Sequence, residues 1–276
     1  MTLSLSEQLT YSTIRIECFD SKGNISTGTG YFFNFKFNKE TREHIPTIVT
    51  NKHVIKNASI GKLIFCIAEN GEPVNNKHHT INITDFENIW IPHDSPDVDL
   101  CILPIAQLLK ETKKKNIDLF YIALTISNIP TKEDLEDLTA LEEVIMIGYP
   151  NGIWDSYNNK PIIRKGITAT HIALDYNNKK EFVIDMACFP GSSGSPVFLL
   201  NEGSYSSKKK GNIVIGKGRF FILGTLYAGP QHLVTGEIRD IPISTKRMTF
   251  STIPNNLGYV IKYNRLLELE KQLKID

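Results

Sequence analysis

Three short segments, far apart in the chain, place a histidine, an aspartate and a serine beside runs of apolar residues. The stretch Thr47-Ile-Val-Thr-Asn-Lys-His53 ends on the histidine, Asp99-Leu-Cys-Ile-Leu103 begins on the aspartate, and Phe189-Pro-Gly-Ser-Ser193-Gly-Ser-Pro196 surrounds the serine with small residues. A serine hydroxyl becomes a nucleophile when an imidazole takes its proton and a carboxylate fixes the tautomer of that imidazole. The segments therefore predict acyl transfer, with Ser193 as nucleophile, His53 as general base and Asp99 as its orienting acid.

Each segment taken singly has a plainer interpretation. A histidine after an apolar run is more often a structural residue, and an aspartate there often caps a turn. The stretch Gly191-Ser-Ser-Gly-Ser195 resembles a flexible linker. Strand-like runs abut both of its ends without a spacer, which argues against the linker. The catalytic hypothesis depends on the three segments occurring together.

The elements that must position these residues are short strands, because alternating or continuous apolar runs of four to eight residues recur along the chain. This density of strands predicts a barrel or a sandwich rather than βαβ units. The predicted strands are 13–18, Tyr31–Phe37, Thr47–Thr50, Lys62–Ala68, Thr80–Thr84, Leu100–Pro104, Glu143–Gly148, Ile162–Ala169, Glu181–Cys188, Pro196–Leu200, Ile213–Ile215 and Arg219–Tyr227.

A charge-rich stretch between the two groups of strands predicts the domain organisation. Two segments in it, Ala106–Lys115 and Lys132–Leu141, have helical character. We therefore expect an N-terminal β unit over 1–117, a connector over 118–140 and a C-terminal β unit over 141–276. The last unit should include surface excursions at Asn201–Lys217 and Pro230–Asn256. It should end in a helix over Tyr263–Leu273, whose leucines share one face.

The composition argues against several classes of function. The 276 residues carry 31 basic and 30 acidic side chains, a formal charge of +1, so no global field draws the chain to nucleic acid or to an anionic membrane. The lysine runs at 113–115 and 208–210 are expected to be solvated turns. No apolar run approaches the length of about 18 residues that a membrane span needs. We expect neither a nucleic-acid partner nor a membrane.

The cysteines and the N-terminus predict a cytoplasmic location. The first residues carry neither a basic start nor an apolar stretch of signal-peptide length. Cys18, Cys66, Cys101 and Cys188 are widely spaced and are expected to be buried thiols in a reducing compartment. His78, His79 and His93 lack a closed ligand set, so no metal is expected. The composition, rich in Ile, Asn and Lys, is typical of an AT-rich and hence bacterial genome.

The motifs as a set resemble the trypsin-like (chymotrypsin-fold) serine proteases, and most of all the HtrA/Deg-type protease domain. Four stretches carry this likeness: Gly28-Thr-Gly-Tyr-Phe32, taken as a turn; Thr50-Asn-Lys-His53; Asp99-Leu-Cys-Ile102; and Ile184 to Pro196 around Ser193. Leu223-Gly-Thr and Gly258-Tyr-Val-Ile are similar to the strands that close the second barrel. The likeness covers roughly 12–104 and 143–268, and a protease domain without a PDZ domain is expected.

The resemblance implies an all-β fold of two antiparallel six-stranded barrels, with a helical connector and a C-terminal helix, and an active site between the barrels. It places the oxyanion hole at the N–H groups of Gly191 and Ser193. It places Ala187 near the base of the substrate-binding pocket, with Tyr227, Ala228 and Gly229 along its wall. Because Ala187 stands where trypsin-type enzymes carry an aspartate, a basic residue before the scissile bond is disfavoured. A small or medium apolar residue is expected there.

The function predicted from this combination is a serine endopeptidase that hydrolyses protein or peptide substrates through an acyl-enzyme, without a cofactor. Two alternatives stay open at this point. The chain could be a protease-fold regulatory or binding module, gated by a partner protein or inactive, with the excursions as docking loops. It could also be an esterase that uses the same triad.

Overall fold

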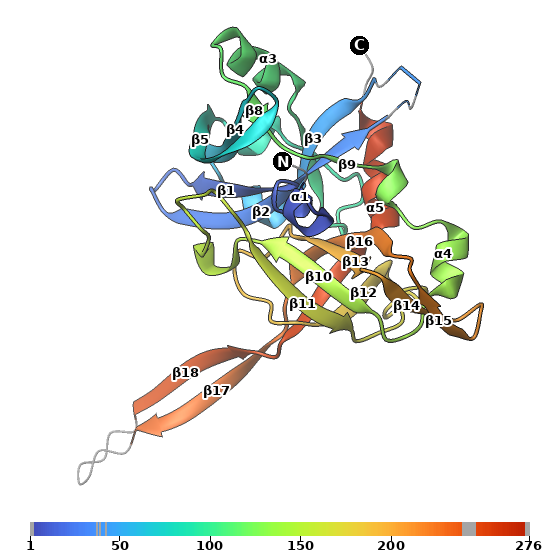
Figure 1. Cartoon of the computed structure of the whole chain (residues 1–276). Coiled ribbons are helices and arrows are strands. Elements are labelled where there is room, and N and C mark those ends of the chain that lie inside the picture. The colour runs from blue at the N-terminus through green and yellow to red at the C-terminus, as the bar shows by residue number, and fades with distance from the viewer. Residues whose placement is uncertain (1–2, 37, 39, 42, 239–246, 274–276) are drawn as a thin grey trace.

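The computed structural model describes residues 3–36, 38, 40–41, 43–238 and 247–273. Its strands form two units that stack on one another (Figure 1). Phe37, residues 239–246 of the second predicted excursion, and the outermost residues of the predicted units, 1–2 and 274–276, lie outside the described residues.

The N-terminal unit is a nine-stranded sheet with the order β5-β4-β1-β2-β3-β7-β6, to which β8 is added beside β4 and β9 beside β2. Its pairs are antiparallel except for β2 with β9, which is parallel. The strands are β1 (Thr13–Phe19), β2 (Ile25–Phe35), β3 (Ile45–Thr50), β4 (Ile60–Glu69), β5 (Glu72–Thr84), β6 (Ile91–Pro92), β7 (Cys101–Pro104), β8 (Leu119–Phe120) and β9 (Leu124–Thr125).

The C-terminal unit is a closed six-stranded barrel with the order β10-β11-β12-β19-β16-β13. The stretches 223–225 and 258–261 lie in β16 and β19, which pair with each other to close it. The barrel strands are β10 (Glu143–Gly148), β11 (Ile162–Thr168), β12 (Glu181–Asp185), β13 (Pro196–Asn201), β16 (Arg219–Ala228) and β19 (Leu257–Lys262).

The predicted all-β, trypsin-like fold class is confirmed, with one difference in the N-terminal unit. That unit is a nine-stranded sheet in which β5 and β6 end the path and do not pair with each other in the described part of the chain. The sequence predicted only the last five residues of β5. Its first part reads Glu-Pro-Val-Asn-Asn-Lys-His-His and is mostly exposed, as suits a polar edge strand without an apolar alternation. The first part of the predicted connector supplies β8 and β9.

Helices in the described residues are few and short. The predicted connector helices are found as α3 (Ala106–Lys114) and α4 (Lys132–Asp137), and the predicted C-terminal helix as α5 (Tyr263–Glu268) with the 3-10 turn η4 (Leu269–Gln272). The others are α1 (Leu5–Thr10), α2 (Lys52–Ile55), η1 (Glu87–Ile89), η2 (Ile126–Asn128) and η3 (Pro150–Gly152). No helix in the described ranges is both long and apolar enough to cross a membrane.

Both predicted excursions contain two-stranded hairpins that do not join the barrel. The first is β14 (Ser204–Ser207) with β15 (Asn212–Ile215), and the second is β17 (Gln231–Ile238) with β18 (Arg247–Pro254). The second hairpin projects away from the body of the molecule, as the orange-red ribbon of Figure 1 shows. It leaves and returns between β16 and β19.

The two units share an apolar core at their junction. One buried cluster combines residues of the N-terminal sheet such as Tyr31 and Val49, barrel residues such as Ile147 and Phe198, and Leu266 of α5. Burial of apolar surface is the main favourable contribution to folding, so this shared cluster holds the two units against each other. Side chains of the sheet and of the barrel can therefore be held in fixed positions where the two units meet.

Candidate active site

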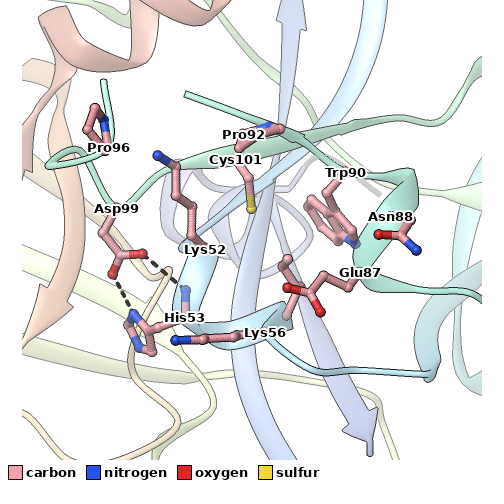
Figure 2. A pocket seen from close by; sticks show the side chains of 11 residues that line it. Lys52, His53, Lys56, Glu87, Asn88, Trp90, Pro92, Pro96, Asp99 and Cys101 are labelled. Carbon is pink, nitrogen blue, oxygen red and sulfur yellow. Dashed lines mark hydrogen bonds and ion pairs between the residues drawn. The ribbon is translucent and has the colours of Figure 1, made fainter. Parts of the chain in front are cut away.

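His53 and Asp99 meet at one end of the paired strands β3 and β7. His53 lies in α2, directly after β3, and Asp99 lies directly before β7, the strand that pairs with β3. The Asp99 carboxylate contacts His53 twice: Oδ2 lies 2.5 Å from Nδ1, and Oδ1 accepts the main-chain N–H of His53 at 3.0 Å (Figure 2). With Nδ1 engaged, the imidazole presents Nε2, and the side chain is 46% exposed. The carboxylate thus fixes the orientation of an accessible base.

Two neighbours of His53 hold the loop that carries Asp99. The amide of Asn51, a fully buried residue, donates from Nδ2 to the main-chain oxygen of Asp99 at 2.7 Å. The Lys52 ammonium donates to the carbonyl oxygens of His93 and Ser95 at 2.8 and 3.0 Å. Asp97, which the sequence analysis set aside in favour of Asp99, is exposed. The pairing of Asp99 with His53 is therefore built by the local fold.

Ser193 follows a tight turn over Phe189–Ser192. The Ser192 N–H donates to the Phe189 carbonyl at 3.0 Å, and Gly191 has φ +84°. A type II turn requires a positive φ at its third residue and favours proline at its second, and Pro190-Gly191 satisfies both. Gly194, on the other side of the serine, has φ +85°. The glycines in this segment thus serve its backbone conformation.

The turn directs main-chain donors toward the cleft side of Ser193. The carbonyl of Pro190 accepts the N–H of Asn151, in η3, at 2.5 Å. In a trans peptide the N–H points opposite to the C=O, so the Gly191 N–H points away from η3. Among the described residues, no acceptor takes up the N–H of Gly191 or of Ser193. Both predicted oxyanion donors are free to bind a ligand oxygen.

Thr29 of β2 joins the serine turn to β3, the strand that leads to His53. Its N–H donates to the Ser193 carbonyl at 2.9 Å, and its hydroxyl donates to the Gly191 carbonyl at 2.9 Å. Its own carbonyl accepts the Thr50 hydroxyl at 2.7 Å, and Thr50 lies three residues before His53. Thr29 is fully buried, so these hydrogen bonds are not shared with water. The sequence analysis did not assign Thr29 a role.

The glycines that flank Thr29 make this close approach possible. The structure corrects the interpretation of Gly28–Phe32 as a turn, because these residues lie within β2. A Cβ at Gly28 would lie 2.4 Å from Cγ1 of Val54, next to His53, and a Cβ at Gly30 would lie 2.7 Å from Cγ2 of Ile48. Glycine in a strand often marks such a close approach. Gly28 and Gly30 therefore indicate close packing within β2 rather than a turn.

The hydroxyl of Ser193 lies toward the end of β16. Its Oγ donates to the Tyr227 carbonyl at 3.4 Å, and within the described residues it makes no hydrogen bond to His53. The Tyr227 hydroxyl donates to Oε2 of Glu181 at 2.9 Å. Burial raises the pKa of the Tyr227 phenol, and the Glu181 and Asp99 carboxylates raise that pKa further. Tyr227 thus lies within electrostatic range of Asp99 and in contact with Ser193.

The predicted substrate-binding residues lie in two segments, one on either side of the serine turn in the chain. On one side, Ala187 is half-buried and precedes the serine turn. On the other, Tyr227 and Ala228 end β16, and Gly229 follows them. A Cβ at Gly229 would lie 3.3 Å from Cβ of Cys188, so the two sides come into van der Waals contact at that point.

A cavity of about 600 Å³ adjoins the His53–Asp99 pair and was missed from sequence. Its lining includes Lys56, which follows α2, together with Glu87, Trp90 and Pro96 of the segment between β5 and β7 (Figure 2). That segment has no strand periodicity, and an aromatic residue near prolines is only a weak signal of a cavity. Across the described residues there is no group of three or more His, Cys, Asp or Glu side chains that could hold a metal ion.

The sequence matches the family described as trypsin-like peptidase domain over residues 28–205, which is more than half of the chain. The chain belongs to this family. The match spans His53, Asp99 and Ser193, so the trypsin-like peptidase resemblance predicted from the motifs is confirmed. A comparison with curated proteins gave no match.

Three solved structures are similar to this chain. An inactive serine-to-alanine mutant of Rv3671c from M. tuberculosis H37Rv is 11% identical, with 97% of this chain and 90% of that one covered and a TM-score of 0.44. The HtrA-type protease AlgW with a tripeptide is 15% identical (95% and 60% covered, TM-score 0.44). Deg5 is 16% identical (83% and 88% covered, TM-score 0.44). This chain thus spans about three fifths of the AlgW chain.

Proposed function

We propose that the chain is a serine endopeptidase that cleaves protein or peptide substrates through an acyl-enzyme. The observation that carries the proposal is the double contact between Asp99 and His53, which leaves Nε2 of an accessible imidazole facing outward. Thr29 and Thr50 hold the Ser193 turn against β3, the strand that leads to this imidazole. Membership of the trypsin-like peptidase family supports the same chemistry.

In the proposed mechanism Ser193 Oγ attacks the scissile carbonyl while Nε2 of His53 takes its proton. Asp99 stabilises the imidazolium that forms. The N–H groups of Gly191 and Ser193 stabilise the oxyanion, and the imidazolium then protonates the leaving amine. Water repeats the sequence on the acyl-enzyme and releases Ser193. Catalytic hydrogen bonds are often long without a ligand and tighten in the complex, so bound substrate is expected to bring Ser193 to His53.

Labelling with a fluorophosphonate probe tests this proposal, because the probe forms an adduct only with an activated serine. The expected result is one adduct, mapped by mass spectrometry to Ser193 and absent in His53→Ala. Ser195 is a matched control, since its hydroxyl lies two residues away, is fully buried and has no hydrogen-bond partner in the described structure. Ser195→Ala should keep the adduct on Ser193. An adduct elsewhere, or one that persists in His53→Ala, would overturn the proposal.

One observation favours the gated alternative: the Ser193 hydroxyl is hydrogen-bonded to the Tyr227 carbonyl instead of His53. In that case a partner protein would bind a hairpin and bring the hydroxyl to the base. Constant activity of the purified chain on an unfolded protein substrate removes this alternative. The esterase alternative uses the same residues, and comparing kcat/KM for matched amide and ester substrates separates it from an endopeptidase.

The predicted cytoplasmic location stays a prediction, and the state of the cysteines is compatible with it. All four are free and buried. Burial raises the pKa of Cys18 to about 12 and that of Cys188 to about 11, so these thiols stay protonated near neutral pH. A protonated, buried thiol is a poor nucleophile, which leaves Ser193 as the nucleophile of the proposal.

A further inference from the structure

The cavity beside the His53–Asp99 pair takes no part in the proposed mechanism. Its volume of about 600 Å³ is within the range of sites that bind small molecules. Its lining combines three buried side chains, those of Ile55, Trp90 and Cys101, with the two members of the pair. A ligand in this cavity would therefore contact the proposed general base and its orienting carboxylate.

One wall of the cavity carries a buried hydrogen-bond donor without a partner. Trp90 is 5% exposed, and its indole nitrogen has no hydrogen-bond partner in the described part of the chain. An indole N–H can only donate, and a buried tryptophan usually finds an acceptor. The ring packs edge to face on Phe86, with 5.6 Å between the centroids. Figure 2 shows the nitrogen at the edge of the ring that faces Glu87, another lining residue. The packed ring thus presents a donor that requires an acceptor.

The charged groups of the lining are balanced and mostly engaged. The Lys52 ammonium donates to two main-chain carbonyls, and Asp99 binds His53. Oε2 of Glu87 accepts a main-chain N–H at 2.8 Å. The lining contains two lysines, Lys52 and Lys56, and two carboxylates, so it carries no net charge when the imidazole is neutral. Among the described lining residues, the indole therefore calls for a neutral acceptor in apolar surroundings rather than for a counter-ion.

We propose that this cavity binds a neutral, apolar small molecule whose carbonyl oxygen accepts the Trp90 N–H, and that this ligand is an effector of the His53–Asp99 pair. The two side chains of the pair are 46% and 25% exposed. A ligand that displaces water from them lowers the local dielectric constant, which strengthens their hydrogen bond. The binding site goes beyond the proposed endopeptidase function, and only the effect on reactivity rests on that function.

The indole N–H signals of an NMR spectrum test the site directly. The chain has two tryptophans, so a ¹H–¹⁵N spectrum should contain two indole signals, and Trp154→Phe identifies that of Trp90. Trp154 does not line the cavity. The probe is cyclohexyl methyl ketone, and the control is isopropenylcyclohexane, which has a CH₂ group in place of the carbonyl oxygen. The ketone should move the Trp90 indole proton downfield in a saturable way and leave the Trp154 signal unchanged.

The affinities of the two probes, measured by isothermal titration calorimetry, test the hydrogen bond. A neutral hydrogen bond corresponds to roughly two- to tenfold in affinity, so the ketone should bind more tightly than the alkene by about that factor. Trp90→Phe keeps an aromatic ring without the donor and should bind both probes equally, whereas Trp154→Phe should keep the preference for the ketone.

Two results with the unmodified protein would overturn the site, so a misfolded variant does not protect the inference. One is a Trp90 signal that does not move up to the solubility limit of the ketone. The other is equal affinity for ketone and alkene, which would mean that water serves the indole as well as a ligand oxygen does.

The rate of fluorophosphonate labelling at Ser193 tests the effector role. Saturating ketone should raise this rate by roughly two- to tenfold, the range of one strengthened hydrogen bond, and should raise it less in Trp90→Phe at the same concentration. An unchanged or lower rate overturns the effector role. The titrations need no catalysis, so a fixed Trp90 signal contradicts this inference alone, whereas absence of labelling in the free protein contradicts the proposed function.

Discussion

Replacing Thr29 with valine should separate the positioning of the serine turn from the chemistry of the triad. Valine has the shape of threonine and suits a strand, so the substitution removes only the hydroxyl. That hydroxyl donates to the Gly191 carbonyl at 2.9 Å and accepts the Tyr149 N–H at 3.0 Å. Thr29 is fully buried, so both main-chain groups would be left without water as a substitute partner.

The expected magnitudes follow from these two contacts. Leaving a buried donor or acceptor unpaired costs about 1–3 kcal/mol, so the loss of two partners should lower the free energy of unfolding by roughly 2–6 kcal/mol. The peptide that contains the Gly191 carbonyl is adjacent to the Ser193 N–H region, so the oxyanion donors should shift with it. Loss of one oxyanion donor costs about 10²–10³ in kcat, and we expect about a hundredfold decrease with little change in KM.

The assay combines urea unfolding with steady-state kinetics on the variant and on two controls. Thr29→Ser keeps the hydroxyl and should restore kcat. Thr47→Val removes another buried hydroxyl of the same sheet, one that donates to the Phe33 carbonyl at 2.7 Å. It should reduce stability by about 1–3 kcal/mol and leave kcat unchanged. A Thr29→Val enzyme with the kcat of the unmodified protein would refute the positioning role of this hydroxyl.

Three further predictions concern other parts of the structure. Gly194→Ala should reduce kcat/KM for peptide cleavage by about 10²-fold or more although His53, Asp99 and Ser193 are unchanged. The new Cβ would lie 1.9 Å from the Thr29 carbonyl oxygen, and the residue has φ +85°. Peptide cleavage with full activity would contradict this prediction. Glu142→Gln should lower the free energy of unfolding by about 3–5 kcal/mol in a urea titration, because it leaves the buried Arg219 without the carboxylate that lies 2.8 Å away. The exposed ion pair of Lys165 with Glu143 is the control. Glu143→Gln should lower the free energy of unfolding by under about 1 kcal/mol. Burial lowers the pKa of His93, so the unfolded chain binds a proton more readily than the folded one, and the free energy of unfolding should decrease as pH falls through about 6.5. The urea midpoints at pH 5 and pH 7.5 should therefore differ less in His93→Gln than in the unmodified protein. An equal difference in both would exclude His93 as the cause.

The sequence by itself determined the class of fold and the residue types of the candidate site. Period-two apolar runs depend only on neighbours along the chain, so most strands and the helices at 106–114, 132–137 and 263–268 could be predicted. The motifs around His53, Asp99 and Ser193 led to the trypsin-like peptidase family for the same reason, because each is a local pattern. The first part of edge strand β5, residues 72–79, escaped prediction because a solvated strand needs no apolar alternation.

Only the tertiary structure decided how these local pieces cooperate. The hydrogen bond from Thr29 to Gly191 joins residues 162 positions apart, and no local pattern records such a pair. The same holds for the contact of Arg164 with Ala187, which comes from the way β11 crosses the barrel next to the serine turn. Hydrogen bonds and charge environments depend on distances in space, whereas strand patterns depend on spacing along the chain. The family could therefore be predicted from residue types, whereas the positions of the site residues in space required the fold.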